Sequence, residues 1–319
     1  MTYTPVALFA YRRLSILERT VEALAANKGA HLTDIYFFSD GPKKHLDENS
    51  VYQVRNYLKT VQGFRSVKII NRKVNFGLAR NIVEGVTEIL SKSDSVIVLE
   101  DDIITSPFFL EYMNQSLDLY RNDSRVAQIC AYSYLEGDLA RKIKDNTYFV
   151  KGSDCLAWAT WSSSWKAYMI NPWFLLKEVF RRNQVKEFNR CHSYNYYGML
   201  FKSCICNTYS WAIRFYASNF LLSRFTLYPV KSLAVHVGND QVATNYKYSM
   251  AKDPLDVPLS YEPIEPLPIP VCEVSQVTLS FNNYLKKSQT GKLWYLRIFL
   301  DSVVIPFLAF INYPRSTHD

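Results

Sequence analysis

The chain lacks a glycine-rich loop for binding phosphate. Neither G-x-G-x-x-G nor G-x-x-x-x-G-K-[ST] occurs in its 319 residues. Such loops hold phosphate groups with backbone N–H groups at the start of a helix. Their absence excludes the dinucleotide fingerprint and the P-loop, so the phosphates of a bound nucleotide would have to be held mainly through a metal ion.

Cysteine is scarce, and the six cysteines lie scattered in mostly apolar segments: Cys130, Cys155, Cys191, Cys204, Cys206 and Cys272. This usage is typical of free thiols in a reducing compartment, and the Cys-Ile-Cys spacing matches no zinc site. The apolar stretch Pro5–Ala10 is too short for a signal peptide and leads straight into Arg12. We therefore expect a cytoplasmic protein.

No cluster of basic residues points to nucleic acid. The net charge is +8, yet the sequence has no block of five or more basic residues and no RNP-like or zinc-finger pattern. A charge of this sign favours anionic lipids or phosphorylated substrates, and an ordinary basic surface is the alternative. We expect no nucleic-acid partner.

Long hydrophobic runs are also missing. Arg297, Asp301 and Pro306 interrupt the apolar tail, residues 286–315, whose longest uncharged run, Ser302–Pro314, is too short to span a bilayer. The tail could lie on the inner face of the cell membrane as an interfacial helix, or dock onto the core or another subunit. Before it, residues 254–270 carry six of the thirteen prolines, which indicates an extended wrapping segment or a linker.

Short apolar runs alternate with helical patterns over the first ~130 residues. This alternation predicts an α/β fold with a mixed, mainly parallel sheet flanked by helices. Strands are expected at Pro5–Ala10, Asp34–Ser39, Val67–Ile70 and Val96–Leu99, and helices at Leu14–Asn27, Val51–Val61, Leu78–Leu90 and Phe108–Tyr120. Further helices are expected at Trp173–Arg182, Tyr194–Cys204 and Ser210–Leu222, and a last strand at Leu233–Val237.

Polar residues follow each of the first four predicted strands: Tyr11-Arg12, Ser39-Asp40-Gly41, Asn71-Arg72 and Glu100-Asp101-Asp102. Ligands bind at the carboxyl ends of parallel strands, so these tips should share one edge of the sheet. A helix beginning near Ser106 would explain one acid, but three adjacent carboxylates repel one another and call for a cation. The sequence therefore predicts a site for Mn²⁺ or Mg²⁺ that binds a diphosphate.

Positive charge and a base-binding group lie near the same tips. Arg72, Lys73 or Arg80 could add charge beside the phosphates, and Asp40 is placed to accept a hydrogen bond from a base N–H group.

Four segments in this order resemble the GT-A fold glycosyltransferases: PVALFAYRR, NRKVNFGLARN, VLEDDIITSPFFLEYM and CLAWATWSSSWK. The resemblance is to bacterial family 2-like enzymes related to the N-acetylglucosaminyltransferase I group, and it covers roughly residues 3 to 246. SWAIRFYAS and SLAVHVGNDQVATN are also similar. The resemblance implies a GT-A domain at residues 1–250, with a nucleotide-binding half at about 1–130 and an acceptor half at about 131–250. A Pro-rich segment at 251–275 and an apolar, basic tail at 276–319 would follow.

The resemblance also implies roles for individual residues. Asp102 would be the direct metal ligand, and His236 would face the metal or diphosphate or be a core histidine. The donor would be bound by Ala10, Tyr11, Arg12 and Asp40 at the nucleoside, by Asn75, Gly77 and Arg80 at the ribose and phosphates, and by Glu100 and Asp101 at the ribose, sugar or metal-bound water. Trp158 and Trp161 would shape the donor and acceptor pocket, or belong only to the core.

The implied reaction is an inverting transfer from a nucleotide-sugar, with UDP-sugars favoured, to a glycan or lipid-linked acceptor in surface polysaccharide or lipopolysaccharide synthesis. A carboxylate would act as general base. Tyr209 stands where relatives have an acid, which leaves Asp154 and Asp240; the first could instead cap a helix and the second form a turn. Ala157 and Ala243 replace family glycines. A non-catalytic scaffold and a nucleotidyltransferase are the alternatives. A nucleotidyltransferase would normally have a glycine-rich loop after the first strand, and this sequence has none there.

Overall fold

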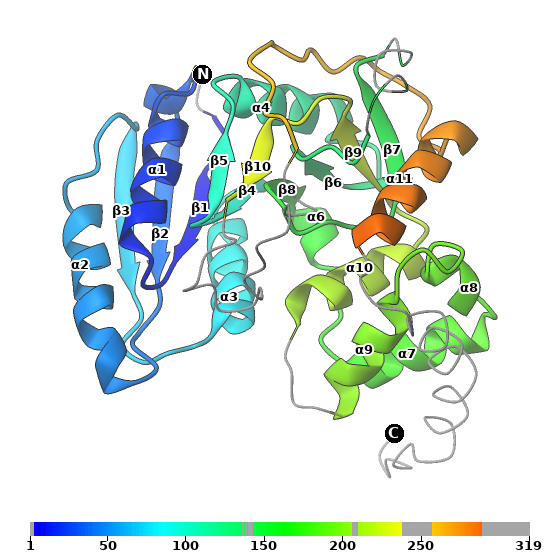
Figure 1. Cartoon of the computed structure of the whole chain (residues 1–319), viewed down its shortest axis with the longest axis horizontal. Coiled ribbons are helices and arrows are strands. Elements are labelled where there is room, and N and C mark those ends of the chain that lie inside the picture. The colour runs from blue at the N-terminus through cyan, green and yellow to red at the C-terminus, as the bar shows by residue number, and fades with distance from the viewer. Residues whose placement is uncertain are drawn as a thin grey trace.

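The central feature of the computed structural model is an eight-stranded sheet (Figure 1). The structure describes residues 3–135, 137, 139, 143, 145–205, 210–237 and 257–288. In spatial order, the strands are β3 (Ser66–Asn71), β2 (Asp34–Ser39), β1 (Val6–Ala10), β4 (Ser95–Glu100), β8 (Trp158–Trp161), β6 (Val126–Cys130), β9 (Phe225–Pro229) and β7 (Thr147–Lys151). A separate two-stranded sheet pairs β5 (Ile103–Thr105) with β10 (Ala234–His236).

The sheet is mixed but mainly parallel. Strands β3, β2, β1 and β4 pair in parallel, and so do β6 and β9, whereas β8 and β7 run against their neighbours. The predicted α/β architecture is therefore confirmed. The carboxyl ends of β1, β2, β3 and β4 lie at one edge, which is where a ligand is expected.

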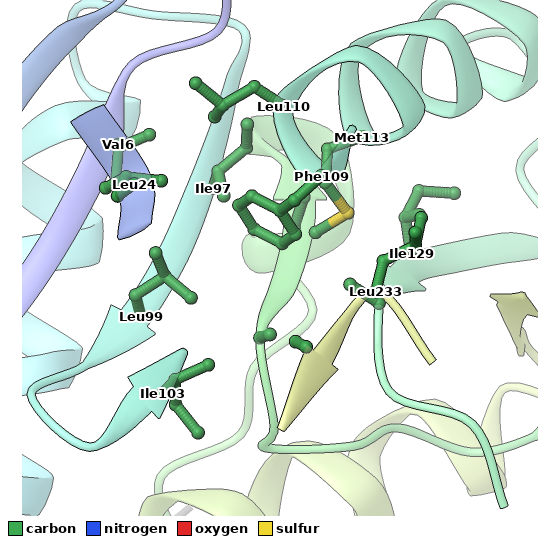
Figure 2. Packing of buried hydrophobic residues seen from close by; sticks show 14 of the residues in the cluster. Val6, Leu24, Ile97, Leu99, Ile103, Phe109, Leu110, Met113, Ile129 and Leu233 are labelled. Carbon is green, nitrogen blue, oxygen red and sulfur yellow. The ribbon is translucent and has the colours of Figure 1, made fainter. Parts of the chain in front are cut away.

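Helices cover both faces of the sheet. One face packs against α1 (Leu14–Ala25), α2 (Glu48–Leu58) and α4 (Phe109–Tyr120), and the other against α3 (Leu78–Leu90) and α10 (Trp211–Leu221). In Figure 2, Phe109 and Met113 of α4 point toward Ile97 of β4 and Ile129 of β6. This two-sided burial explains why β1 and β4 are continuous apolar runs without polar alternation.

A helical unit lies in sequence between β8 and β9. It comprises α6 (Ser162–Trp165), α7 (Pro172–Arg181), α8 (Val185–Phe188) and α9 (Tyr196–Ile205), with α7 and α9 packed against α10. The last described helix, α11 (Ser275–Ser288), packs on a tyrosine-rich cluster through Val277 and Phe281. No helix within these described ranges has the length and apolarity needed to cross a membrane.

The chain between β10 and α11 is extended where it is described. Ser260 N–H donates to the Ser232 carbonyl (2.8 Å), and Tyr120 joins residues 267–269 through its hydroxyl. Ile264 and Val271 are buried in the same core as β1 and β4. The segment thus runs over α4 before it reaches α11. The tail beyond Ser288 lies outside the described residues.

Most first-half elements match the expected ranges, and α3 begins and ends at the expected residues. Strands β5, β6, β7, β8 and β9 were not expected from the sequence. They have three to five residues, and β6 and β8 are buried on both faces, so they lack the alternating pattern that marks a half-exposed strand.

Ala157, just before β8, has a left-handed backbone conformation with φ of 47°. This conformation costs an L-residue about 1–2 kcal/mol, which explains a preference for glycine at this position. Ala157 and Ala159 are both buried in the same cluster. Ala159→Gly should lower the free energy of unfolding measured in urea titrations. Ala157→Gly should cost about 1 kcal/mol less, because glycine relieves the backbone strain at that position. Equal losses would contradict the strain.

Candidate active site

The acidic residues lie at the carboxyl end of β4, beside the end of β1. Glu100 is the last residue of β4 and pairs with Phe9 of β1. The chain then turns into β5, whose pairing with β10 places His236 opposite Ile103. Val237 N–H donates to the carbonyl of Asp102 (2.9 Å), which fixes the turn against β10. Segments more than 130 residues apart in sequence are thereby joined at one point.

Asp102 is the meeting point of two other side chains. Its Oδ2 lies 3.3 Å from Nε2 of His236 and 2.6 Å from Nη2 of Arg13. The same Nη2 lies 2.5 Å from Oδ1 of Asp101, whose Oδ2 accepts from Tyr11 N–H (3.4 Å). Both aspartates are buried. The guanidinium of Arg13 therefore bridges two of the three adjacent carboxylates.

The three acids do not share the negative charge equally. Burial, with the charges of Asp102 and Asp101, raises the pKa of Glu100 to about 8. Burial raises the pKa of Asp101 to about 6, although Arg13 opposes the shift. For Asp102, burial is outweighed by His236 and Arg13, which hold its pKa below the usual value. Asp102 is thus the most acidic of the three carboxylates, which suits a metal ligand.

The residues present fit a hard divalent cation. Asp102 offers an ionised oxygen and His236 an imidazole nitrogen at the same place. The part of the chain that the structure describes contains no group of three or more Asp, Glu, His or Cys side chains able to enclose a metal. Mg²⁺-type sites that bind nucleotides use few protein ligands and complete their shell with water and phosphate oxygens. Among the described residues, Arg13 bridges Asp101 and Asp102, and His236 adds a second partner for Asp102.

Asp40 holds the loop before α3. Its Oδ1 accepts from Gly41 N–H (2.9 Å) and Phe76 N–H (2.8 Å), and its Oδ2 accepts from Gly77 N–H (2.9 Å) and the Asn75 amide (3.1 Å). A Cβ on Gly41 would clash with a backbone atom of this loop, so only glycine fits there. The base-binding role of Asp40 stays a prediction, and these contacts also make it an anchor that positions Asn75 and Gly77.

The tip of β1 is tied to the loop before α2 by Asp47. This buried carboxylate accepts from Arg12 (2.6 Å) and from the hydroxyl of Tyr11 (2.8 Å). Ala10 lies in the core, and its carbonyl accepts from Asp40 N–H (2.9 Å). The β1 tip is therefore built into the edge of the site, with Arg12 directed toward Asp47.

Two arginines flank an aromatic ring beside this loop. The guanidinium carbons of Arg80 and Arg72 lie 4.1 Å and 5.0 Å from the ring centroid of Phe76. Arg80 is exposed and pairs with Glu84 (2.6 Å), while Arg72 donates to Asn81 (3.0 Å). Two guanidinium groups thus lie beside the loop that joins β3 to α3, and their contact with phosphates stays a prediction.

Asp154 lies in the segment between β7 and β8. Its Oδ1 accepts from the N–H groups of Cys155 (2.6 Å) and Leu156 (3.0 Å), and its Oδ2 accepts from the hydroxyl of Tyr228 (3.2 Å). Burial raises its pKa, against these hydrogen bonds and one from Tyr134. No helix follows it, so the carboxylate closes a turn and does not cap a helix.

Cys155 connects Asp154 to the acids at the end of β4. Burial raises the pKa of its thiol, and the carboxylates of Asp154, Glu100 and Asp102 raise it further. The thiol is therefore within electrostatic reach of both groups of acids.

Trp158 and Trp161 lie in the hydrophobic core. The sequence had left open whether they shape a pocket or only fill the core. Trp158 is 1% exposed and stacks on Trp165 and Trp211, with ring centroids 5.9 Å and 5.1 Å away. Trp161 packs in the core on the other face. Both belong to β8, in the middle of the sheet. These contacts favour a structural role for both rings.

Asp240, Tyr209 and Ala243 lie outside the described residues. Arg13 and Asp47, which complete the charged network, were not among the residues expected from the sequence. The sequence did contain a signal for Arg13, because two consecutive arginines follow β1. In the structure Arg12 pairs with Asp47, and Arg13 pairs with the acids of the site.

The acidic end of β4 and the loop held by Asp40 thus lie at the edge formed by the carboxyl ends of parallel strands, where α/β proteins bind ligands. A family model described as glycosyl transferase family 2 matches residues 6–201. This match spans more than half of the 319 residues, so the chain belongs to that family and is a glycosyltransferase. Among curated proteins, no sequence matches it.

Three solved structures illustrate the similarity. The mannosyltransferase PcManGT from Pyrobaculum calidifontis, in complex with GDP-Man and Mn²⁺, is 12% identical with a TM-score of 0.32, over 41% of this chain and 36% of that one. Glucosyl-3-phosphoglycerate synthase from Mycobacterium tuberculosis, with Mn²⁺, UDP and glucosyl-3-phosphoglycerate, is 9% identical (0.32; 56% and 59%). TarS from S. aureus with UDP-GlcNAc is 8% identical (0.34; 51% and 46%). The chain spans less than two thirds of each protein's length.

Proposed function

We propose that the chain is a metal-dependent, inverting glycosyltransferase that uses a nucleotide-sugar donor, with UDP-sugars favoured. The observation that carries this proposal is the convergence of ionised Asp102 and His236 at the carboxyl end of β4. A bound Mn²⁺ or Mg²⁺ would neutralise the diphosphate as it leaves. Asp102 and His236 would hold that ion.

The remaining residues would bind and orient the donor. Asp40 fixes the loop that presents Asn75 and Gly77, and Arg80 lies one helical turn beyond it. Glu100, whose pKa is about 8, is mostly protonated at neutral pH and so can donate a hydrogen bond to a ribose or sugar oxygen. Arg13 would balance the charge of Asp101 and Asp102 before the ion and the diphosphate bind.

Asp154 is our candidate for the general base. A raised pKa makes its carboxylate a stronger base, and the half-buried side chain directly precedes Cys155, whose thiol pKa is raised by the charges of both Asp154 and Glu100. Tyr194 and Tyr196 are half-buried aromatic rings on the same side, and the charge of Asp154 acts on Tyr196. Tyr196 stacks on Tyr216 and contacts Tyr194, so these rings would form an aromatic wall beside the acceptor.

The finer assignments are also proposals. The Glu-Asp-Asp motif and the segments after it favour kinship with the N-acetylglucosaminyltransferase I group. The domain limits 1–250, 251–275 and 276–319, a cytoplasmic location, and a glycan or lipid-linked acceptor in surface polysaccharide synthesis follow from the same resemblance. Membrane contact by the tail concerns residues outside the described ranges.

The proposal is tested by thermal shift with UDP, GDP, CDP and dTDP, each with and without Mn²⁺, followed by turnover of the corresponding sugar donors. One nucleotide is expected to stabilise the protein more strongly when Mn²⁺ is present, because a ligand that binds only the folded state raises its stability. Absence of both manganese-dependent binding and donor turnover would favour the non-catalytic scaffold.

The same assay separates binding from proton transfer. Asp154→Asn is expected to keep the manganese-dependent shift and to lower turnover at least about 10²-fold, which is typical of losing a general base. The matched control is Asp123→Asn, a surface carboxylate that pairs with Arg125 at the start of β6. Wild-type turnover in Asp154→Asn would transfer the role of base to another residue.

A further inference from the structure

The helical unit carries an exposed apolar surface on α7 and α9. Sixteen large apolar side chains are exposed among the described residues, and seven of them lie between residues 169 and 222. Five cluster on α7, α9 and the residue before Asn171: Ile170, Phe174, Phe180, Met199 and Ile205, which are 38–60% exposed. Exposed apolar residues gathered in this way mark an interaction site, whereas isolated ones do not.

The two helices lie side by side and run in opposite directions. The ring centroids of Trp173 and Phe201 are 6.4 Å apart, and the hydroxyl of Tyr197 reaches the carbonyl of Leu176 (3.5 Å). Their inner faces pack on α10. This arrangement leaves the outer faces of both helices on one surface, which we call the α7–α9 face.

Both outer faces have the same pattern. Phe174, Lys177 and Phe180 on α7, and Met199, Lys202 and Ile205 on α9, are exposed at positions i, i+3 and i+6. Side chains at this spacing share one side of a helix. Each helix therefore presents a lysine between two apolar residues.

The charge around this face is strongly positive. Residues 162–205 contain six exposed Lys or Arg and two Glu, a net charge of +4, since the seventh basic residue, Arg190, is buried and pairs with Glu273. A second copy of the same face would be repelled by this charge. An anionic lipid surface complements it, because the apolar side chains enter the headgroup boundary while the lysine ammonium groups meet the phosphates.

We infer that the α7–α9 face binds the surface of an anionic membrane. In Figure 1, α7 and α9 lie below the sheet, on the side toward which β1, β2 and β3 point. Binding there would hold the edge that carries Asp102 on the membrane side of the molecule. The inference rests on the residues of this face and not on the reaction proposed above.

The test is co-sedimentation of the full chain with two kinds of vesicle, one of phosphatidylcholine alone and one that also contains the anionic lipid phosphatidylglycerol. Wild-type protein is expected to bind the anionic vesicles. F174S/F180S and K177E/K202E are each expected to weaken this binding at least about tenfold. The control L46S/Y52S changes two exposed apolar residues elsewhere and is expected to bind like wild type.

Folding and oligomeric state are measured on the same samples. Near-UV circular dichroism and the nucleotide-dependent thermal shift should be unchanged in all variants, because every substituted side chain is exposed. Wild-type binding by both α7–α9 variants would overturn the inference and assign membrane contact to another segment. Loss of a wild-type dimer in light scattering, without vesicle binding, would overturn it in favour of a protein–protein interface.

Discussion

Asp102→Asn is expected to abolish the manganese-dependent part of the nucleotide-induced thermal shift and to lower turnover by about 10³-fold. Asn has nearly the same shape as Asp but is a neutral and weaker metal ligand. Loss of one group that stabilises the departing charge costs a transferase about 3–4 kcal/mol of transition-state stabilisation, which corresponds to this factor. The shift is measured with the preferred nucleoside diphosphate at fixed Mn²⁺, and turnover with its sugar donor.

Two features make this substitution informative. Arg13 keeps Asp101 as a partner, so the variant retains one side of the bridge and should fold. Asp118→Asn on α4 is the matched control, because its carboxylate is 79% exposed and pairs only at 3.4 Å with Arg121. Retention of the full manganese-dependent shift in Asp102→Asn would refute the metal assignment, whatever happens to turnover.

The sequence predicted the elements that position this site because their patterns are long and regular. Helix α3 has a full apolar stripe, and β4 is an uninterrupted apolar run ending in Glu100. A parallel sheet built from these elements places the polar tips at one edge, although the order of the strands was not predicted. His236 could be placed there only by resemblance, since the pairing of β10 with β5 is set by tertiary contacts and not by a local pattern.

What the sequence could not predict depends on where individual side chains turn. Arg12 and Arg13 are adjacent and chemically equal, yet one pairs with Asp47 and the other with the acids of the site. Trp158 was a candidate for a pocket, but β8 lies between β4 and β6, and that neighbourhood buries the ring. Composition shows that such residues are available, while burial and partner choice require the packed fold.

Arg13→Met is expected to lower the free energy of unfolding by about 3 kcal/mol at pH 7 without metal. Met replaces the aliphatic part of the arginine side chain but not its charge, so Asp101 and Asp102 stay buried without their shared cation. Removing one partner of a buried ion pair costs about 3–5 kcal/mol. Arg65→Met is the control, because it breaks an ion pair with Asp34 at the surface. The Arg65 side chain is 42% exposed, so this loss should cost less than about 1 kcal/mol.

The pH dependence has a defined sign. In the wild type, Arg13 helps to hold the pKa of Asp102 below its usual value, so this contribution to stability is present at neutral pH and is lost as pH falls through the depressed value. Arg13→Met removes that contribution and raises the pKa of both aspartates. The difference between variant and wild type should therefore be largest at pH 7 and shrink toward pH 4, where protonation removes the uncompensated charge.

Mn²⁺ should rescue this variant. A divalent cation bound at Asp102 and His236 would replace the positive charge that Arg13 supplied, so urea titrations at pH 7 should show a larger gain from Mn²⁺ in Arg13→Met than in the wild type. Arg13→Lys should fall between the two, because it keeps the charge without the fork that spans both carboxylates. If Mn²⁺ stabilises the wild type and Arg13→Met equally, the arginine and the metal do not share the role of counter-ion, and the charge balance inferred for this site is wrong.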